Sequence, residues 1–129
     1  MSYTNPAVLA GGGMRIGVFG GTFDPVHVGH LILAEQCRAQ AGLDEVWFLP
    51  SYHPPHKAAA GVTRFEHRCD MVELAVAGHP GFRLDRIEKE LPPPSYTAET
   101  LAELRRRRPG TEFALLMGAD GLPDLPGWY

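Results

Sequence analysis

The stretch from Gly20 to His30 contains the residues of this chain best suited to chemistry on a phosphate group. It reads Gly-Gly-Thr-Phe-Asp-Pro-Val-His-Val-Gly-His. Gly20 and Gly21 let a ligand approach the backbone closely, because neither residue carries a Cβ atom. His27 and His30 are three residues apart, so on a helix they share a face and can hold the same group. The stretch therefore predicts an anion site at which two imidazoles bind phosphate.

The segments that flank this stretch indicate how it is positioned. Residues 15–19 form a short apolar run typical of a buried strand, and residues 31–37 predict a helix. A strand that turns through glycines into a helix presents free backbone N–H groups and the positive end of the helix dipole. Pro25 restricts its own φ and favours an extended Asp24, so the turn is expected to be stiff.

Other interpretations of the same residues are weaker. The dinucleotide-binding pattern G-x-G-x-x-G is absent, and so is the G-K-[ST] ending of a P-loop. A zinc site at His27 and His30 is disfavoured, because the protease pattern requires histidines at i and i+4 with a glutamate beside the first. A glycine pair alone is usually only a turn, and a lone histidine is usually structural or exposed. The combination favours phosphate binding, and no protein-built metal site is expected.

The rest of the chain alternates predicted strands and helices. Residues 45–50 form a second apolar strand, and Gly42 is placed to end the helix before it. Strand, helix and strand at this spacing form a βαβ unit with a right-handed crossover, hence a parallel sheet. Helices are predicted over 64–77 and 98–108, and strands over 82–87 and 113–117. We predict an α/β fold with a Rossmann-like parallel sheet and helices on both faces.

Two loops are expected to face the same ligand as the glycine turn. Lys57, in Pro-Pro-His-Lys, follows the second strand, and Gly118 and Asp120 follow the strand at 113–117. Open α/β sheets bind ligands at the carboxyl ends of their strands, so Lys57 is placed to meet phosphate. Taken alone, the Lys57 loop would be a solvated connector.

Composition excludes several classes of protein. A chain of 129 residues with 44% hydrophobic residues suits one globular domain, which we assign to residues 14–129 after a flexible leader at 1–13. The formal net charge of −3 gives no general attraction to nucleic acid, and the four arginines at 105–108 complement a helix end. No apolar run is long enough for a membrane span. Cys37 and Cys69 suit reduced thiols in a cytoplasmic protein.

The motifs together resemble a known family of enzymes. The stretch from Gly20 to His30 is similar to the signature of the nucleotidyltransferase superfamily, which carries a [HT]-x-G-H motif. The later motifs resemble those of bacterial nicotinate-nucleotide adenylyltransferases. These motifs are Pro-Pro-His-Lys at 54–57, Arg64 with Met71, Ser-Tyr-Thr-Ala-Glu-Thr-Leu at 95–101, and Gly-x-Asp-x-Leu at 118–122 followed by Trp128 and Tyr129. The resemblance covers residues 15–129.

The resemblance implies an activity and a set of site residues. AMP would pass from ATP to nicotinate mononucleotide with Mg²⁺, giving deamido-NAD and pyrophosphate in NAD biosynthesis. The partners would be these small molecules, with neither nucleic acid nor membrane, and the protein could form a homo-oligomer. The implied catalytic residues are His27, His30 and Lys57. Those implied for ATP are Gly20, Gly21, Thr22, Phe23, His27, His30, Gly118 and Asp120. Those implied for nicotinate mononucleotide are Tyr96, Thr97, Asp120, Trp128 and Tyr129.

One departure from the family pattern keeps alternatives open. The family carries an Ile-Ser-[SA]-Thr-x-[IL]-Arg motif near its C-terminus, and that motif is not found in these 129 residues. We expect the sequence to be a fragment that lacks the C-terminal part. The alternatives are an incomplete nucleotide-binding module without catalysis and a superfamily relative with another acceptor.

Overall fold

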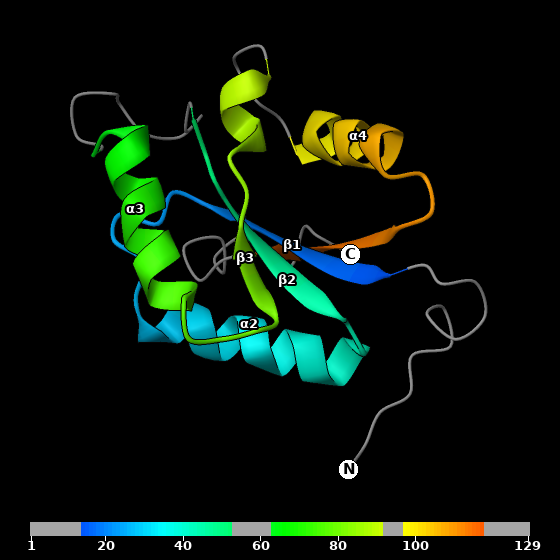
Figure 1. Cartoon of the computed structure of the whole chain (residues 1–129), viewed down its shortest axis with the longest axis horizontal. Helices are drawn as coiled ribbons and strands as arrows, with labels where there is room; N and C mark the ends of the chain where they lie inside the picture. Colours follow the sequence, from blue (N-terminus) through cyan, green and yellow to red (C-terminus); the bar gives the residue numbers. More distant parts are fainter. Residues whose placement is uncertain (1–13, 53–62, 92–96, 118–129) are drawn as a thin grey trace.

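The computed structural model describes residues 14–52, 63–91 and 97–117. Its strands are β1 (Arg15–Gly21), β2 (Glu45–Pro50), β3 (Phe82–Leu84) and β4 (Glu112–Met117). They form one sheet in the order β3-β2-β1-β4, and every neighbouring pair is parallel (Figure 1). The predicted parallel sheet is confirmed. Because β1 lies between β2 and β4, its glycine end is flanked by the carboxyl ends of both neighbours.

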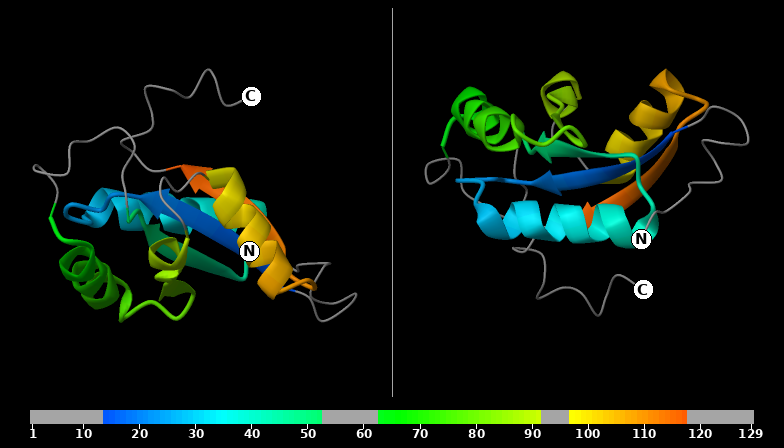
Figure 2. Two further views of the ribbon diagram at one scale, coloured as in Figure 1. Left: turned by 90° about the horizontal axis from the view of Figure 1, so that it is seen from above. Right: turned by 60° about the horizontal axis from the view of Figure 1, so that its bottom comes forward.

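Helices cover both faces of this sheet, as predicted. They are α2 (Val28–Ala41), α3 (Phe65–Val76) and α4 (Thr97–Arg107), with a 3₁₀ helix, η2, at Ile87–Glu90. Figure 1 and the two views of Figure 2 show α2 and α4 on opposite sides of the sheet. The arrangement has the layers of a Rossmann-like domain.

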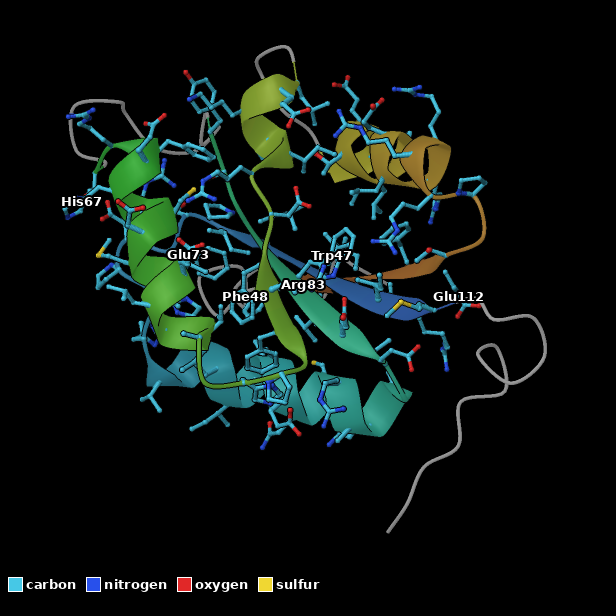
Figure 3. The ribbon with its side chains drawn as sticks, in the orientation of Figure 1. Trp47, Phe48, His67, Glu73, Arg83 and Glu112 are labelled. Carbon is cyan, nitrogen blue, oxygen red and sulfur yellow. The ribbon has the colours of Figure 1, made fainter. Side chains whose placement is uncertain are left out.

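Two hydrophobic cores lie on the two faces, and β2 contributes to both. Phe48 packs with the residues of α2 and α3, whereas its neighbour Trp47 packs with Ile87 of η2 and Leu104 of α4 (Figure 3). Successive side chains of a strand point to opposite faces, so a strand buried on both sides reads as a continuous apolar run. That is the reason residues 45–50 show no alternation.

Two strands end at other residues than the sequence predicts. β1 continues through Gly20 and Gly21, so the glycines end the strand and the turn proper begins at Thr22. The strand predicted over 82–87 stops at Leu84, because the Asp85 carboxylate accepts the Ile87 N–H at 2.9 Å and starts a turn of 3₁₀ helix.

α2 begins earlier in the chain than predicted, and β4 is more exposed than predicted. α2 begins at Val28, before the predicted residue 31, and ends at Ala41. Its C-cap is Gly42, whose φ of 66° is left-handed as expected for a C-cap glycine. β4 was expected to be buried, but Leu115 is 41% exposed. β4 is an edge strand of the described sheet, so a strand neighbour covers only one of its sides.

Candidate active site

The carboxyl ends of three strands meet around the glycine pair. In the register of the sheet, Gly20 pairs with Leu49 and Met117, and Gly21 pairs with Pro50. Gly20 is exposed, and a Cβ atom placed on it would meet no described atom within 4 Å. The backbone at Gly20 is therefore open to a ligand, and β2 and β4 end beside it at Pro50 and Met117.

Thr22 and Phe23 follow the glycines as buried residues. Phe23 is only 2% exposed, and its φ of 52° is left-handed, a conformation that costs a non-glycine residue about 1 kcal/mol. Its ring packs 5.3 Å from Phe19 and 5.6 Å from Phe48 between centroids. These ring contacts hold Phe23 in its strained backbone conformation. The side chains of Thr22 and Phe23 thus belong to the protein interior, and their backbone is the part available to an anion.

Two carbonyl oxygens of this turn accept hydrogen bonds from donors within the protein. The Gly21 carbonyl accepts the Ser51 N–H at 2.9 Å, and the Thr22 carbonyl accepts Nη1 of Arg68 at 2.8 Å. Asp24, an exposed residue of the same turn, accepts the Thr63 N–H at 2.9 Å. Carbonyl oxygens repel phosphate oxygens, so committing them to internal donors makes the turn more suitable for an anion.

His27 and His30 form a capping box at the start of α2. His27 is the N-cap, and its Nδ1 accepts the Gly29 N–H at 3.1 Å. His30 is the third residue of the helix, and its Nδ1 accepts the His27 N–H at 3.0 Å. The ring centroids lie 3.9 Å apart with 31° between the planes. The predicted pairing of the two imidazoles is confirmed, with His27 preceding the helix and not inside it.

The capping bonds determine the tautomers of the two rings. A neutral imidazole has one N–H donor and one acceptor nitrogen, and in both rings Nδ1 is the acceptor. The ring proton of each histidine therefore sits on Nε2. His27 is exposed, whereas His30 is 7% exposed and packs edge-on against Phe23 at 5.0 Å. The arrangement places the exposed His27 ring at the N-terminus of a 14-residue helix, which favours a negative group.

Two further residues at this edge were not singled out from the sequence. Arg68 of α3 is 1% exposed, and burial, the largest influence, lowers its pKa while the charge of Asp24 opposes that shift. The burial of Arg68 could have been predicted from its position on the apolar stripe formed by Phe65, Cys69 and Val72. Ser51 follows β2, and its buried hydroxyl has no hydrogen-bond partner among the described residues.

Several predicted site residues lie outside the described part of the chain. They are Lys57, Tyr96, Gly118, Asp120, Trp128 and Tyr129. Thr97 is described only as the first residue of α4. Their roles remain predictions.

The arginines at the end of α4 are mostly engaged within the protein. Arg106 and Arg107 both bind Glu103, Arg107 also binds Glu90 at 2.9 Å, and the Arg108 guanidinium lies 5.0 Å from the Trp47 ring centroid. These contacts agree with the interpretation of this run as a helix end.

The described residues contain neither a cluster suited to a metal ion nor a helix suited to a membrane. In 14–52, 63–91 and 97–117, His, Cys, Asp and Glu form no group of three or more that could hold a metal ion. No described helix has the length and apolar character needed to cross a membrane.

Comparison with known proteins gives the class of this protein. Residues 18–129 match the cytidylyltransferase-like family, and the chain belongs to that family. It is 49% identical over 115 residues to a probable nicotinate-nucleotide adenylyltransferase of Bacillus pumilus. It is 46% identical over 115 residues to the nicotinate-nucleotide adenylyltransferase of Bacillus subtilis. Each of these alignments covers 89% of this chain and 61% of the relative, so the chain spans about three-fifths of their length.

Solved structures show the same fold at lower sequence identity. The nicotinic acid mononucleotide adenylyltransferase of Plasmodium falciparum, complexed with NaAD, matches with a TM-score of 0.69 at 21% identity. That match covers 90% of this chain and 57% of the solved chain. The same enzyme complexed with APC matches with a TM-score of 0.66.

Proposed function

We propose that this protein is an adenylyltransferase that moves AMP from ATP to nicotinate mononucleotide, giving deamido-NAD and pyrophosphate. The observation that carries the proposal is the close pair of His27 and His30 rings, whose Nδ1 atoms both accept backbone N–H groups. The names of the Bacillus relatives and the NaAD complex of the solved neighbour support the choice of substrates.

The proposed reaction is an in-line displacement at the α-phosphorus of ATP. A phosphate oxygen of the mononucleotide bonds to that phosphorus, the bond to the bridging oxygen of the β-phosphate breaks, and pyrophosphate leaves. Such a reaction is catalysed by positioning and by stabilising charge on the phosphoryl oxygens. His27 and His30 would hold those oxygens, Lys57 would add positive charge, and the backbone of 20–23 would bind the phosphates.

The remaining predicted residues complete the two substrate sites in this proposal. Gly118 and Asp120 would contact ATP, and Asp120 would also bind a ribose of the acceptor. Trp128 would stack on the pyridine ring, Tyr96 would line the acceptor site, and Thr97 with the Tyr129 N–H would meet the nicotinate carboxylate. The order of the sheet supports this grouping, since β4 ends at Met117, which pairs with Gly20.

Mg²⁺ is proposed to enter bound to the phosphates of ATP. Mg²⁺ commonly uses one or two carboxylates, substrate phosphates and water. Near the glycine turn, Asp24 offers a carboxylate on the exposed side, which fits this mode of binding. The metal would neutralise charge on the departing pyrophosphate. Two free thiols, Cys37 and Cys69, support a reducing, cytoplasmic setting for the protein.

A second candidate is a nucleotide-binding module that does not catalyse transfer. The observation in its favour is that this chain spans 61% of the Bacillus relatives. Both candidates predict that ATP binds at the histidine pair, and only the first predicts formation of deamido-NAD.

The test combines binding with product analysis. The chain is titrated with ATP and Mg²⁺ in a calorimeter, then incubated with both and nicotinate mononucleotide, and deamido-NAD is sought by mass spectrometry. Arg83→Gln, at an exposed side chain of β3, is the control and should behave as wild type. Binding with product supports the transferase, and binding without product supports the module. If ATP does not bind, both candidates are wrong.

A further inference from the structure

Arg68 is the largest fully buried side chain in the described part of the chain, although it carries a charge. It lies on α3, one turn after Phe65, and its guanidinium carbon is 5.7 Å from the centre of the Phe65 ring. Arginine is rarely buried so completely unless its donors are satisfied, because removing a charge from water is costly. The partners of Arg68 should therefore indicate its role.

The partners of Arg68 are backbone carbonyls at two separate loops. Nη1 donates to the Thr22 carbonyl at 2.8 Å, and Nε donates to the Thr63 carbonyl at 2.7 Å. Thr63 in turn donates its N–H to the Asp24 carboxylate. The guanidinium thus connects the start of α3 to the turn that follows β1, 46 residues earlier in the chain.

The contact with Thr22 orients a complete peptide unit. In a trans peptide, the C=O of one residue and the N–H of the next point in opposite directions. Holding the Thr22 carbonyl toward buried Arg68 therefore directs the Phe23 N–H away from the interior. The left-handed φ of Phe23, 52°, shows that this orientation is kept despite strain.

Arg68 also changes the electrostatics behind the turn. Its two hydrogen bonds go to neutral carbonyls, and it forms no ion pair with a carboxylate of the described residues. Burial lowers the pKa of Arg68, and the negative charge of Asp24 on the same turn opposes that shift. A buried positive charge acts over a longer range than one in water, because the surrounding medium screens it less. Its field therefore extends to an anion bound on the other side of the turn.

We propose that Arg68 is a positioning residue of the nucleotide site, which aims the Phe23 N–H at a phosphate of ATP and adds positive potential behind it. This inference rests on the proposed function, since it takes the glycine turn as the binding site of a nucleoside triphosphate. It adds a residue that does not touch the ligand and acts through the Thr22–Phe23 peptide.

Two substitutions separate the charge of Arg68 from its geometry. Arg68→Gln removes the charge, and Arg68→Lys keeps the charge but cannot bind both carbonyls with a planar fork. Arg83→Gln makes the same change of charge at an exposed side chain far from the turn in sequence and is the matched control. The dissociation constant of ATP with Mg²⁺ is measured by calorimetry, and folding is followed by thermal melts and amide NMR spectra.

The expected result is a graded loss of affinity in folded protein. Arg68→Gln should weaken ATP binding by about tenfold or more, the effect of losing a charge-assisted hydrogen bond. Arg68→Lys should fall between that variant and wild type, and Arg83→Gln should match wild type. Folded Arg68 variants with wild-type affinity would overturn the proposal, even if their melting temperatures were lower.

A second measurement does not depend on the variants folding. Pyrophosphate added to wild-type protein should shift the amide proton of Phe23 downfield, while the amide of exposed His67 should not move. An unchanged Phe23 amide in the presence of bound pyrophosphate contradicts the proposal for Arg68. If wild type binds neither ATP nor pyrophosphate, the proposed function itself fails, so the two failures are distinguishable.

Discussion

His30 accepts the backbone N–H of His27 on its Nδ1 atom at 3.0 Å, and the two rings lie 3.9 Å apart. Nδ1 of each imidazole therefore has a structural role, because it accepts a backbone N–H in the capping box. Capping boxes usually employ Ser or Thr with Glu or Gln. Here two imidazoles take the place of these side chains, so the helix begins with a pair of aromatic rings.

The capping bonds predict the tautomers of His27 and His30. Both rings should carry the proton on Nε2 in the neutral state, because Nδ1 must accept a backbone N–H. Nitrogen-15 spectra of the imidazoles at alkaline pH measure this directly. His67, which is exposed on α3, provides a reference ring in the same spectrum. A protonated Nδ1 on either His27 or His30 would contradict the assignment.

Substitution of His27 should separate capping from catalysis. Asparagine is a favourable N-cap, so His27→Asn should keep the unfolding free energy within about 0.5 kcal/mol, whereas His27→Ala should lose ~1 kcal/mol. Both variants lack the Nε2–H donor, so both should slow deamido-NAD formation by about 100-fold. Urea denaturation and rate assays in parallel provide the test. A fully active His27→Asn protein would exclude a catalytic imidazole at this position.

The buried pair Glu88 and Thr100 should contribute to stability. The Thr100 hydroxyl donates to the Glu88 carboxylate at 2.5 Å, and the two residues are 3% and 8% exposed, respectively. Thr100→Val removes that donor without changing the shape, and it should cost ~2 kcal/mol, because a buried carboxylate loses a hydrogen bond. Thr100→Ser retains the hydroxyl and should cost less. Equal stabilities of the two variants in urea would contradict this account.

Glu35 predicts a pH dependence of stability. Its hydrogen bond to Arg38, followed by that to His79, lowers the pKa of Glu35 from 4.5 to about 2 in the folded protein. A carboxyl group with a lowered folded pKa contributes stability above its unfolded pKa and loses it as the pH falls through the folded value. The window is therefore from pH 4.5 down to about pH 2. The Glu35 side chain is 42% exposed, so the contribution should be only about 0.5–1 kcal/mol after solvent screening.

Comparison of wild type with Glu35→Gln isolates this contribution. Urea unfolding at pH 7 should show the variant to be less stable, and at pH 2 the difference should largely disappear. Glu73→Gln, at an exposed and weakly paired position, is the control and should show no such trend. A difference between wild type and Glu35→Gln that stays constant with pH would contradict the role of the Arg38 and His79 contacts.

The last prediction concerns the choice of acceptor. Nicotinate carries a carboxylate where nicotinamide carries a neutral amide, and stacking on Trp128 cannot distinguish two flat rings of similar size. The Thr97 hydroxyl and the Tyr129 N–H are donors, so an amide that presents its NH₂ group would leave a donor facing a donor. In a full-length protein, we expect kcat/KM to favour nicotinate mononucleotide by about 100-fold or more.

Two variants test that discrimination. Thr97→Val should narrow the ratio by slowing the nicotinate reaction, whereas Trp128→Ala should weaken both acceptors alike. The prediction is wrong if wild type uses the two mononucleotides equally, or if Thr97→Val leaves the ratio of their kcat/KM values unchanged. Either result would show that these donors do not distinguish the carboxylate from the amide.

Local sequence determined the elements of this fold and the location of the candidate site. The apolar run at 45–50, the left-handed Gly42 and the glycine pair before a histidine-rich helix start are effects of neighbouring residues, so they could be predicted. Asp85 shows the limit of such prediction, since one side-chain hydrogen bond to Ile87 converts an apparent strand into a 3₁₀ turn.

Only the tertiary structure decided how the site is supported. Arg68 and Thr22 are 46 residues apart, and no local pattern indicates that a helix arginine reaches the carbonyl of the glycine turn. The packing of Phe23 against Phe48, which maintains a strained backbone, likewise requires β1 and β2 to be adjacent. Contacts between distant segments depend on how the sheet is ordered and on which side chains share a core. A pattern of neighbouring residues carries no information about either.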